Sequence, residues 1–296
     1  RRTPMLNRAV AGAYTPGSTI KTMVALAALK EKIVDPKFQI FSAGFIEIPN
    51  PYDKEHPSRF LDWKAHGWVD IYSALARSSN VYFYEVGGGF EGLKGLGIVR
   101  LIDYWKKFLL GEKTGVDLPE ENSGFLPNPE EKEKRTGQIW RIGDTYNVTI
   151  GQGDLLVTPL QLLNFTASIA NGGKIYQPHF VNSGASSVLF DYSDWKDELS
   201  NVQEGMRDAV QKYYGTANML ASLPVSAAGK TGSSQVANNT KTNAFFVGYL
   251  PAGISEEEGP PKIAILVLIE NAREGSLNAV PIAKDVLEWY YYNRLK

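Results

Sequence analysis

AYTPGSTIKTMVALAALKEKIV, residues 13–34, places a hydroxyl and an amine at the start of an otherwise apolar run. The run predicts a buried helix from about Ser18 to Ile33, because apolar residues occupy almost every side of it. Residues three apart share one face of a helix, so Ser18 and Lys21 are expected to point the same way from its first turn. A serine at a helix start is most often only a cap, so this pair alone is weak evidence of catalysis.

The composition describes a globular protein without a strong overall charge. The chain has 296 residues, of which 43% are hydrophobic and 11% aromatic, and its formal net charge is −1. This balance gives no general attraction to nucleic acid or to an acidic membrane surface. The absence of cysteine excludes disulfides, thiol catalysis and cysteine-ligated zinc. No apolar run is long enough to span a bilayer, and the opening RRTPMLNRAV is not typical of a signal peptide.

Helices dominate the expected secondary structure as far as Leu223. Apolar periodicity and capping residues predict four more helical segments. They are 70–89 with a break at Ser78-Ser79-Asn80, 92–109, 157–173 and 200–215. Two other segments, 36–68 and 111–135, are expected to be loops, because prolines and mixed polarity interrupt them.

The pattern changes after Leu223, where three strands and a closing helix are expected. The strands cover 225–236, 242–250 and 262–271, and the helix covers 279–293 with Pro281 near its start. The third strand is apolar at every position from 263 to 269, as in a strand covered on both faces. The expected fold class is therefore α+β, an antiparallel sheet flanked by helices. We expect one domain over 1–296, with a helical part over about 18–222 and the sheet and closing helix over about 223–296.

Two further short motifs gain meaning beside the first. Ser78-Ser79-Asn80 at a helix break has the simpler interpretation of a cap or turn, and Lys230-Thr231-Gly232 on a strand can mark a bulge. In chain order, however, S-x-x-K, S-x-N and K-T-G form the signature of the serine acyl transferases that interact with penicillin.

Several longer segments share this resemblance. They are NRAVAGAYTPGSTIK, FLDWKAHGWVDIYSALARSSNVYFYEVG, TGVDLPEENSGFLP, GDTYNVTIGQGDLLVTPLQL, EGMRDAVQKYYGTA and NAFFVGYLP. Through them the chain resembles class B penicillin-binding proteins from about Leu6 to Tyr290, least clearly between 175 and 201. The D-W-K, Y-F-Y and G-D-T…I-G-Q-G features resemble the elongation type, penicillin-binding protein 2. The resemblance implies the fold shared by serine β-lactamases and penicillin-binding transpeptidases, and a peptidoglycan D,D-transpeptidase that β-lactams target.

The chemistry of the motifs assigns the central roles, and the resemblance agrees. Ser18 is the expected nucleophile, and a serine hydroxyl needs a base to remove its proton. Lys21, one turn away, is the candidate base, although in related enzymes the identity of the acylation base is disputed. Free lysine has a pKa of about 10.4, so burial and the second positive charge of Lys230 are expected to lower it.

The remaining site residues complete the expected acyl-transfer site. Ser78 can relay a proton to the leaving amine, and Asn80 can hold both Lys21 and a substrate amide. Lys230 is counted with them as a catalytic residue, and substrate binding is assigned to the three residues after it: Thr231, Gly232 and Ser233. Lys230 and Thr231 would bind a terminal carboxylate. By analogy with the family, the backbone N–H groups of Ser18 and Ser233 would form the oxyanion hole.

The sequence departs from the family pattern at two places. The family commonly continues K-T-G with Thr-Ala-Gln, whereas this chain has Ser233-Ser234-Gln235. Ser233 keeps the hydroxyl, so carboxylate binding is expected to survive. Asp154 stands where the family frequently has a bulky aromatic residue.

Other classes of site fit the sequence less well. A phosphate-binding loop would need glycine where Pro224 stands, and no G-x-S-x-G surrounds Ser18. A metal cluster of His56 and His66 with Asp53 and Asp62 is a minor alternative. A β-lactamase or a penicillin-sensing receptor domain on the same scaffold stays open, although no match to the deacylating glutamate of class A β-lactamases is found.

The resemblance also implies partners and a location. It implies peptidoglycan stem peptides ending in D-Ala-D-Ala, β-lactam antibiotics and a membrane glycosyltransferase of the elongation machinery, with no nucleic acid, no cofactor and no metal. It implies an extracytoplasmic position on the periplasmic side, anchored to the inner membrane by an upstream segment. The resemblance also implies that a pedestal and a strand or two precede the Ser18 helix. Residues 1–17 are too few and too polar to supply them, so these parts are expected upstream of the given sequence.

Overall fold

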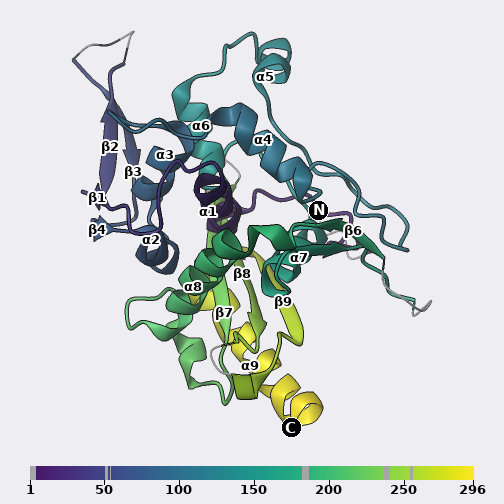
Figure 1. Cartoon of the computed structure of the whole chain (residues 1–296). Helices are drawn as coiled ribbons and strands as arrows, with labels where there is room; N and C mark the ends of the chain where they lie inside the picture. Colours follow the sequence, from purple (N-terminus) through teal and green to yellow (C-terminus); the bar gives the residue numbers. More distant parts are fainter. Residues whose placement is uncertain (1–4, 51–52, 54, 182–186, 237–239, 254–255) are drawn as a thin grey trace.

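The computed structural model describes residues 5–50, 53, 55–181, 187–236, 240–253 and 256–296. A helical part and an antiparallel sheet meet along helix α8, which packs against both helix α1 and strand β7. Figure 1 shows α1 near the middle of the molecule, with the sheet and the yellow C-terminal helix α9 below it.

The opening apolar run forms the buried centre of the helical part. It begins as a 3-10 turn, η1 (Gly17–Ile20), and continues as helix α1 (Lys21–Lys30). Every residue of α1 except Lys30 is buried, which matches an apolar sequence on all sides. The predicted helix is confirmed, but its first turn is tighter and its end earlier than expected.

The break inside segment 70–89 lies where the sequence predicted it. Helix α2 (Ile71–Arg77) ends at Ser78, whose φ of 58° is left-handed, and helix α3 (Asn80–Gly88) starts two residues later. Asp70 caps α2 and Ser79 caps α3 through their side chains.

Five more helices lie in the described residues of the helical part. They are α4 (Gly97–Lys107), α5 (Pro129–Thr136), α6 (Ile142–Thr149), α7 (Pro159–Ala170) and α8 (Lys196–Gln211). Helices α4, α7 and α8 confirm three predicted segments. The loop expected over 111–135 is wrong at its end, because Asn128 caps α5 and Pro129 fits its first turn. Helix α6 was not predicted.

Short strand pairs correct the loop expected over 36–68. Antiparallel pairing joins β1 (Ile40–Ser42) to β4 (Gly67–Val69) and β2 (Phe45–Ile48) to β3 (Ser58–Leu61). Strands of three or four residues are too short to show clear alternation, and Pro49 and Pro57 lie between strands rather than within them, whereas Pro51 lies outside the described residues.

A third pair joins β5 (Lys174–Tyr176) to β6 (Val188–Asp191). The sequence predicted three strands in this chain, all after Leu223, so this pair before Leu223 was missed.

The main sheet has the order β7-β8-β9 and confirms the three predicted strands. They are β7 (Ala228–Val236), β8 (Lys241–Leu250) and β9 (Ile263–Ala272), all antiparallel. Buried apolar side chains form two clusters, one on each face of β9. Successive residues of β9 pack on opposite clusters, with Leu266 on the larger and Val267 on the smaller. These side chains stay half-buried, because within the described residues β9 pairs with β8 alone.

The chain closes with helix α9 (Val280–Tyr290), flanked by π-helical turns at Gly275–Ala279 and Tyr291–Leu295. Pro281 lies in its first turn, as predicted. Across the described part of the chain, no helix combines the length and apolar character needed to cross a membrane.

Candidate active site

Three segments far apart in the sequence meet between α1, the α2–α3 break and β7. The Nζ of Lys21 donates hydrogen bonds to the backbone oxygen of Ser78 at 2.9 Å and to Oδ1 of Asn80 at 2.6 Å. The Nζ of Lys230 donates to Oγ of Ser78 at 2.8 Å. Ser78 thus touches both lysines, and members of all three motifs share one connected set of hydrogen bonds.

Lys21 is a fully buried amine. Burial lowers the pKa of Lys21 from 10.5 to about 7, against the opposing effect of the negative charge of Asp62. The Nζ also lies 5.5 Å from the centre of the Phe83 ring. A substantial share of Lys21 is therefore neutral near pH 7, as a general base requires.

Lys230 is also fully buried, on strand β7. Burial first, and then the positive charge of Lys21, lower the pKa of Lys230 well below its ordinary value. The sequence had led us to expect Lys230 to lower the pKa of Lys21. The repulsion between the two buried amines is mutual and contributes to the lowered pKa of Lys230, whereas the negative charge of Asp62 opposes the lowering of the pKa of Lys21.

Ser18 lies in η1 with its side chain partly exposed, between the buried Gly17 and Thr19. Its hydroxyl makes no hydrogen bond to another residue within the part of the chain that the structure describes. The hydroxyl is therefore available to a substrate. No hydrogen bond joins this hydroxyl to the Nζ of Lys21 in the described structure, where Lys21 bonds to Ser78 and Asn80 instead, and the role of Ser18 as nucleophile stays a prediction.

Close backbone contact joins the start of η1 to β7. Gly17 has a φ of +57°, and a Cβ there would lie 2.7 Å from the backbone oxygen of Ser233. Its N–H donates to the backbone oxygen of Gly151 at 2.8 Å. Only glycine fits this position, and the contact places the segment of Ser18 beside Ser233, as an oxyanion hole shared by the two would require.

The K-T-G strand makes contacts that the sequence only partly indicated. The Oγ1 of Thr231 donates to Oγ1 of Thr216 at 2.8 Å, and Oγ of Ser233 accepts from the N–H of Gly275 at 3.1 Å. A Cβ on Gly232 would lie 2.9 Å from the Thr19 methyl carbon, so this glycine admits the packing of η1. Thr216 was missed as a site residue, although it belongs to the segment KYYGTA.

The segment around Asp154 also reaches the site. The Nε2 of Gln152 donates to the backbone oxygen of Ser233 at 3.3 Å. Asp154 itself is exposed and pairs with Arg135 of α5. The departure from the family pattern at Asp154 thus forms a surface ion pair, which contributes little stability.

The histidine and aspartate side chains considered as metal ligands do not form one cluster in the described structure. Nε2 of His66 lies 3.6 Å from Oδ1 of Asp62, and Nδ1 of His56 lies 2.9 Å from Oδ2 of Asp53. Within the described ranges, no three His, Cys, Asp or Glu side chains gather as a metal site would need. The two pairs that the sequence grouped are therefore separate.

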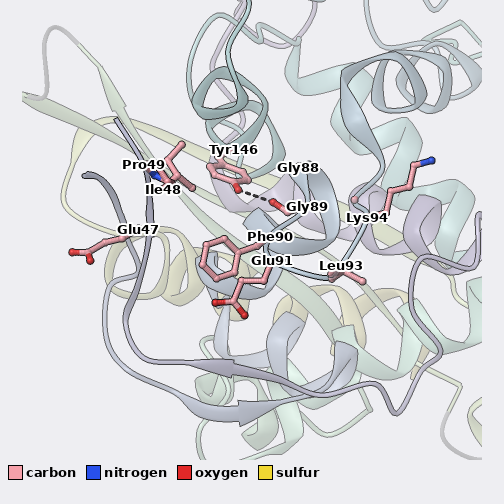
Figure 2. Close-up of a pocket in the computed structure, with 11 residues that line it drawn as sticks. Glu47, Ile48, Pro49, Gly88, Gly89, Phe90, Glu91, Leu93, Lys94 and Tyr146 are labelled. Carbon is pink, nitrogen blue, oxygen red and sulfur yellow. Dashed lines mark hydrogen bonds between the residues drawn. The ribbon is translucent and has the colours of Figure 1, made fainter. Parts of the chain in front are cut away.

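A cavity of about 630 Å³ lies elsewhere, beside the C-terminal end of α3 (Figure 2). Its lining contains no residue of the three motifs and consists of Glu47, Ile48, Pro49, Gly88, Gly89, Phe90, Glu91, Leu93, Lys94, Gly95 and Tyr146. Asn80 starts α3 and Gly88 ends it, so the cavity and the three motifs lie at opposite ends of one helix.

Comparison with known proteins gives a consistent result. The family model described as penicillin binding protein transpeptidase domain matches residues 1–288. Peptidoglycan D,D-transpeptidase MrdA of Haemophilus influenzae is 34% identical over 99% of this chain and 46% of its own length. The chain therefore spans about half the length of this curated relative.

Solved structures of similar proteins share the fold. The penicillin-binding protein PBP2 of Helicobacter pylori, solved in complex with MreC, has a TM-score of 0.83 and 34% identity. The match covers 98% of this chain and 52% of that one. PBP2 of Pseudomonas aeruginosa, in complex with WCK 5153, has a TM-score of 0.82 and 33% identity, covering 98% of this chain and 64% of that one.

Proposed function

Because the chain belongs to the penicillin-binding protein transpeptidase family, we propose that it is a peptidoglycan D,D-transpeptidase acting through a serine acyl-enzyme. One observation carries the proposal beyond family membership. Ser78 accepts from the buried amines of both Lys21 and Lys230, so the three motifs form a single site.

In the proposed acylation, Oγ of Ser18 attacks the carbonyl carbon of the penultimate D-alanine of a donor stem peptide. Its proton passes to the neutral amine of Lys21. The backbone N–H groups of Ser18 and Ser233 stabilise the oxyanion of the tetrahedral intermediate. When the C–N bond breaks, Ser78 relays a proton to the departing D-alanine amine, leaving an ester on Ser18.

Deacylation repeats these steps with an amine of a second stem peptide as the nucleophile. The acceptor amine attacks the ester carbonyl carbon and loses a proton to the neutral amine of Lys21. The bond between the acyl group and Oγ of Ser18 then breaks. Ser18 regains its proton, and the two stem peptides are joined by an amide. Asn80, which accepts from Lys21, would orient the donor amide.

The terminal carboxylate of the donor would bind at Lys230 and Thr231. An anion beside a buried lysine favours its charged form, so carboxylate binding would raise the lowered pKa of Lys230. We expect Lys230→Ala to weaken binding of a carboxylate-bearing penicillin by about 10-fold or more, with a smaller effect on the acylation step. Single-turnover acylation across penicillin concentrations separates the two quantities.

The exposed Lys212 offers a matched control, and Lys212→Ala should leave both quantities unchanged. A penicillin methyl ester provides a second control, because it should lose little affinity when Lys230 is removed. Equal losses for the free acid and the ester would show that Lys230 does not recognise the carboxylate.

Partners and location follow from the same proposal. The substrates would be stem peptides ending in D-Ala-D-Ala, with β-lactams as covalent inhibitors, on the extracytoplasmic side of the inner membrane. The Helicobacter relative was solved in complex with MreC, so we propose a similar protein partner for this chain, in addition to a membrane glycosyltransferase. The anchor, pedestal and strands expected before the Ser18 helix stay predictions.

Labelling with a fluorescent penicillin tests the proposed function against the β-lactamase alternative. A transpeptidase should bind one label per molecule and release it over many minutes or longer, and should join purified donor and acceptor stem peptides. Rapid release together with turnover of a chromogenic cephalosporin would favour a β-lactamase. Absence of any covalent label would contradict both.

A further inference from the structure

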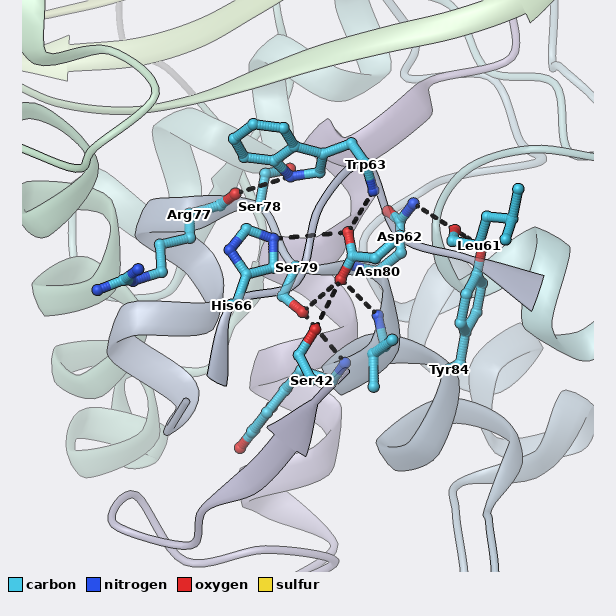
Figure 3. A network of polar contacts seen from close by, with 12 residues as sticks. Ser42, Leu61, Asp62, Trp63, His66, Arg77, Ser78, Ser79, Asn80 and Tyr84 are labelled. Carbon is cyan, nitrogen blue, oxygen red and sulfur yellow. Dashed lines mark hydrogen bonds and ion pairs between the residues drawn. The ribbon is translucent and has the colours of Figure 1, made fainter. Parts of the chain in front are cut away.

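A buried carboxylate lies directly behind the second motif. Asp62 follows strand β3, and its side chain has no exposed surface. Figure 3 shows its carboxylate at the centre of a set of polar contacts that includes Ser42, His66, Ser79 and Asn80. The sequence contained Asp62 within D-W-K but gave it no role beyond a possible metal pair.

One oxygen of Asp62 accepts four hydrogen bonds. Its Oδ2 accepts from Oγ of Ser79 at 2.7 Å, N of Asn80 at 2.8 Å, N of Val81 at 3.0 Å and Oγ of Ser42 at 3.3 Å. Asn80 and Val81 supply the first two N–H groups of α3, which have no partner inside the helix. Asp62 therefore satisfies the start of the helix that presents Asn80.

The side chain of Asn80 is held from the same segment. Its Nδ2 donates to the backbone oxygen of Leu61 at 3.1 Å, while its Oδ1 accepts from Nζ of Lys21. The residue before Asp62 thus fixes the amide of Asn80, and Asp62 fixes its backbone. Both contacts therefore determine the position of the Asn80 oxygen that accepts from Lys21.

The charge of Asp62 is maintained despite burial. Burial alone would raise the pKa of Asp62, but His66, Lys21 and the two backbone N–H groups together hold it below its usual range. The ionisable groups that face Asp62 are His66, Lys21 and Tyr84, and those that face Lys21 are Asp62 and Lys230.

From this geometry we propose that Asp62 is a positioning residue for acylation: it holds the Ser78–Asn80 turn in place and supplies the countercharge of Lys21. The proposal rests on the proposed function, because acylation is its main readout. A residue that only stabilised the fold would lower the melting temperature without changing how acylation depends on pH.

The test compares Asp62→Asn with Asp70→Asn. Asp70 is a matched control, because it caps the neighbouring helix α2 through the N–H of Ser73 at 2.9 Å. The second-order rate constant for labelling by a fluorescent penicillin is measured from pH 5 to pH 9, with the melting temperature of each variant. In the wild type this rate should rise through the pKa of Lys21, at about 7.

Asp62→Asn should lower the plateau rate by about 10-fold to 100-fold, because the turn shifts relative to Lys21. Losing the negative charge should also lower the pKa of Lys21 and move the rising limb to lower pH, by about half a unit. Asp70→Asn should change the plateau less than about twofold and leave the limb in place. Asp62→Glu keeps the charge, so it should leave the limb in place while lowering the plateau.

A plateau within twofold of wild type and an unmoved limb in Asp62→Asn would overturn the proposal. If Asp62→Asn does not fold, Ser79→Ala replaces it; this removes one donor to Asp62 and should lower the plateau about threefold without moving the limb. An unchanged plateau there would also count against the proposal. If the wild type takes no label, the proposed function fails. NMR titration then measures the pKa of Lys21 directly, and the proposal requires this pKa to fall in Asp62→Asn but not in Asp70→Asn.

Discussion

Replacing Ser18 with alanine is expected to abolish covalent labelling by penicillin, a loss of at least about 10⁴-fold in the acylation rate. The lone hydroxyl of Ser18 makes no hydrogen bond within the described structure, and its side chain is partly exposed. The melting temperature should therefore stay close to that of the wild type. Intact-mass measurement after incubation with a penicillin gives the fraction of acylated protein.

Thr22→Ala is the matched control for this variant. Thr22 lies one turn further along and donates its hydroxyl to the backbone oxygen of Thr19 at 2.9 Å. It should retain labelling despite losing a buried hydroxyl. Acylation that persists in Ser18→Ala would remove Ser18 from the role of nucleophile.

Replacing Lys21 with methionine is expected to slow acylation by about 10²-fold or more, the range typical of a positioned general base. Methionine fills similar space without an amine, so the packing of α1 is largely kept. The rise of the acylation rate near pH 7 should disappear with the titrating group. Lys30→Met, at the half-exposed end of the same helix, should behave as the wild type.

The same variant should unfold at a higher temperature. The pKa of Lys21 is lower in the folded state than the ordinary value of 10.5, so the unfolded chain binds more protons between pH 7 and 10.5. Lys21 therefore costs stability near pH 7, and that cost disappears as the pH rises towards 10.5. We expect Lys21→Met to gain about 1–3 kcal/mol near pH 7 and less near pH 10, measured by thermal unfolding at both values. A loss of stability at pH 7 would show that the hydrogen bonds of the amine outweigh the cost of burying it.

The sequence predicted the parts of the fold whose patterns are long. The apolar run of α1 and the strands β7 to β9 each span enough residues to be identified from the sequence alone. The break at Ser78 is short, but its Ser-Ser-Asn sequence is distinctive. The strands β1 to β4 escaped because three or four residues carry little periodicity, and because their stability depends on a partner strand.

The candidate site was predicted only where motifs mark it. Lys21, Ser78, Asn80 and Lys230 were placed by spacing and family resemblance, and the structure joins them through hydrogen bonds. Asp62 and Thr216 reach the site by tertiary packing, from a strand end and from the loop after α8. Both residues lie in segments that carry the family resemblance, D-W-K and EGMRDAVQKYYGTA, but those segments do not indicate which side chains they contact, so the contacts had to come from the structure.

The hydrogen bond between Lys230 and Ser78 has a consequence for how the protein is made. It joins residues 152 positions apart in the chain. At a synthesis rate of 5–20 residues per second, Lys230 is added about 8 to 30 s after Ser78. During that interval the nascent chain holds the serine and lysine of the first motif but lacks strand β7. Reactivity towards penicillin should therefore appear only in chains long enough to have released β7 from the ribosome.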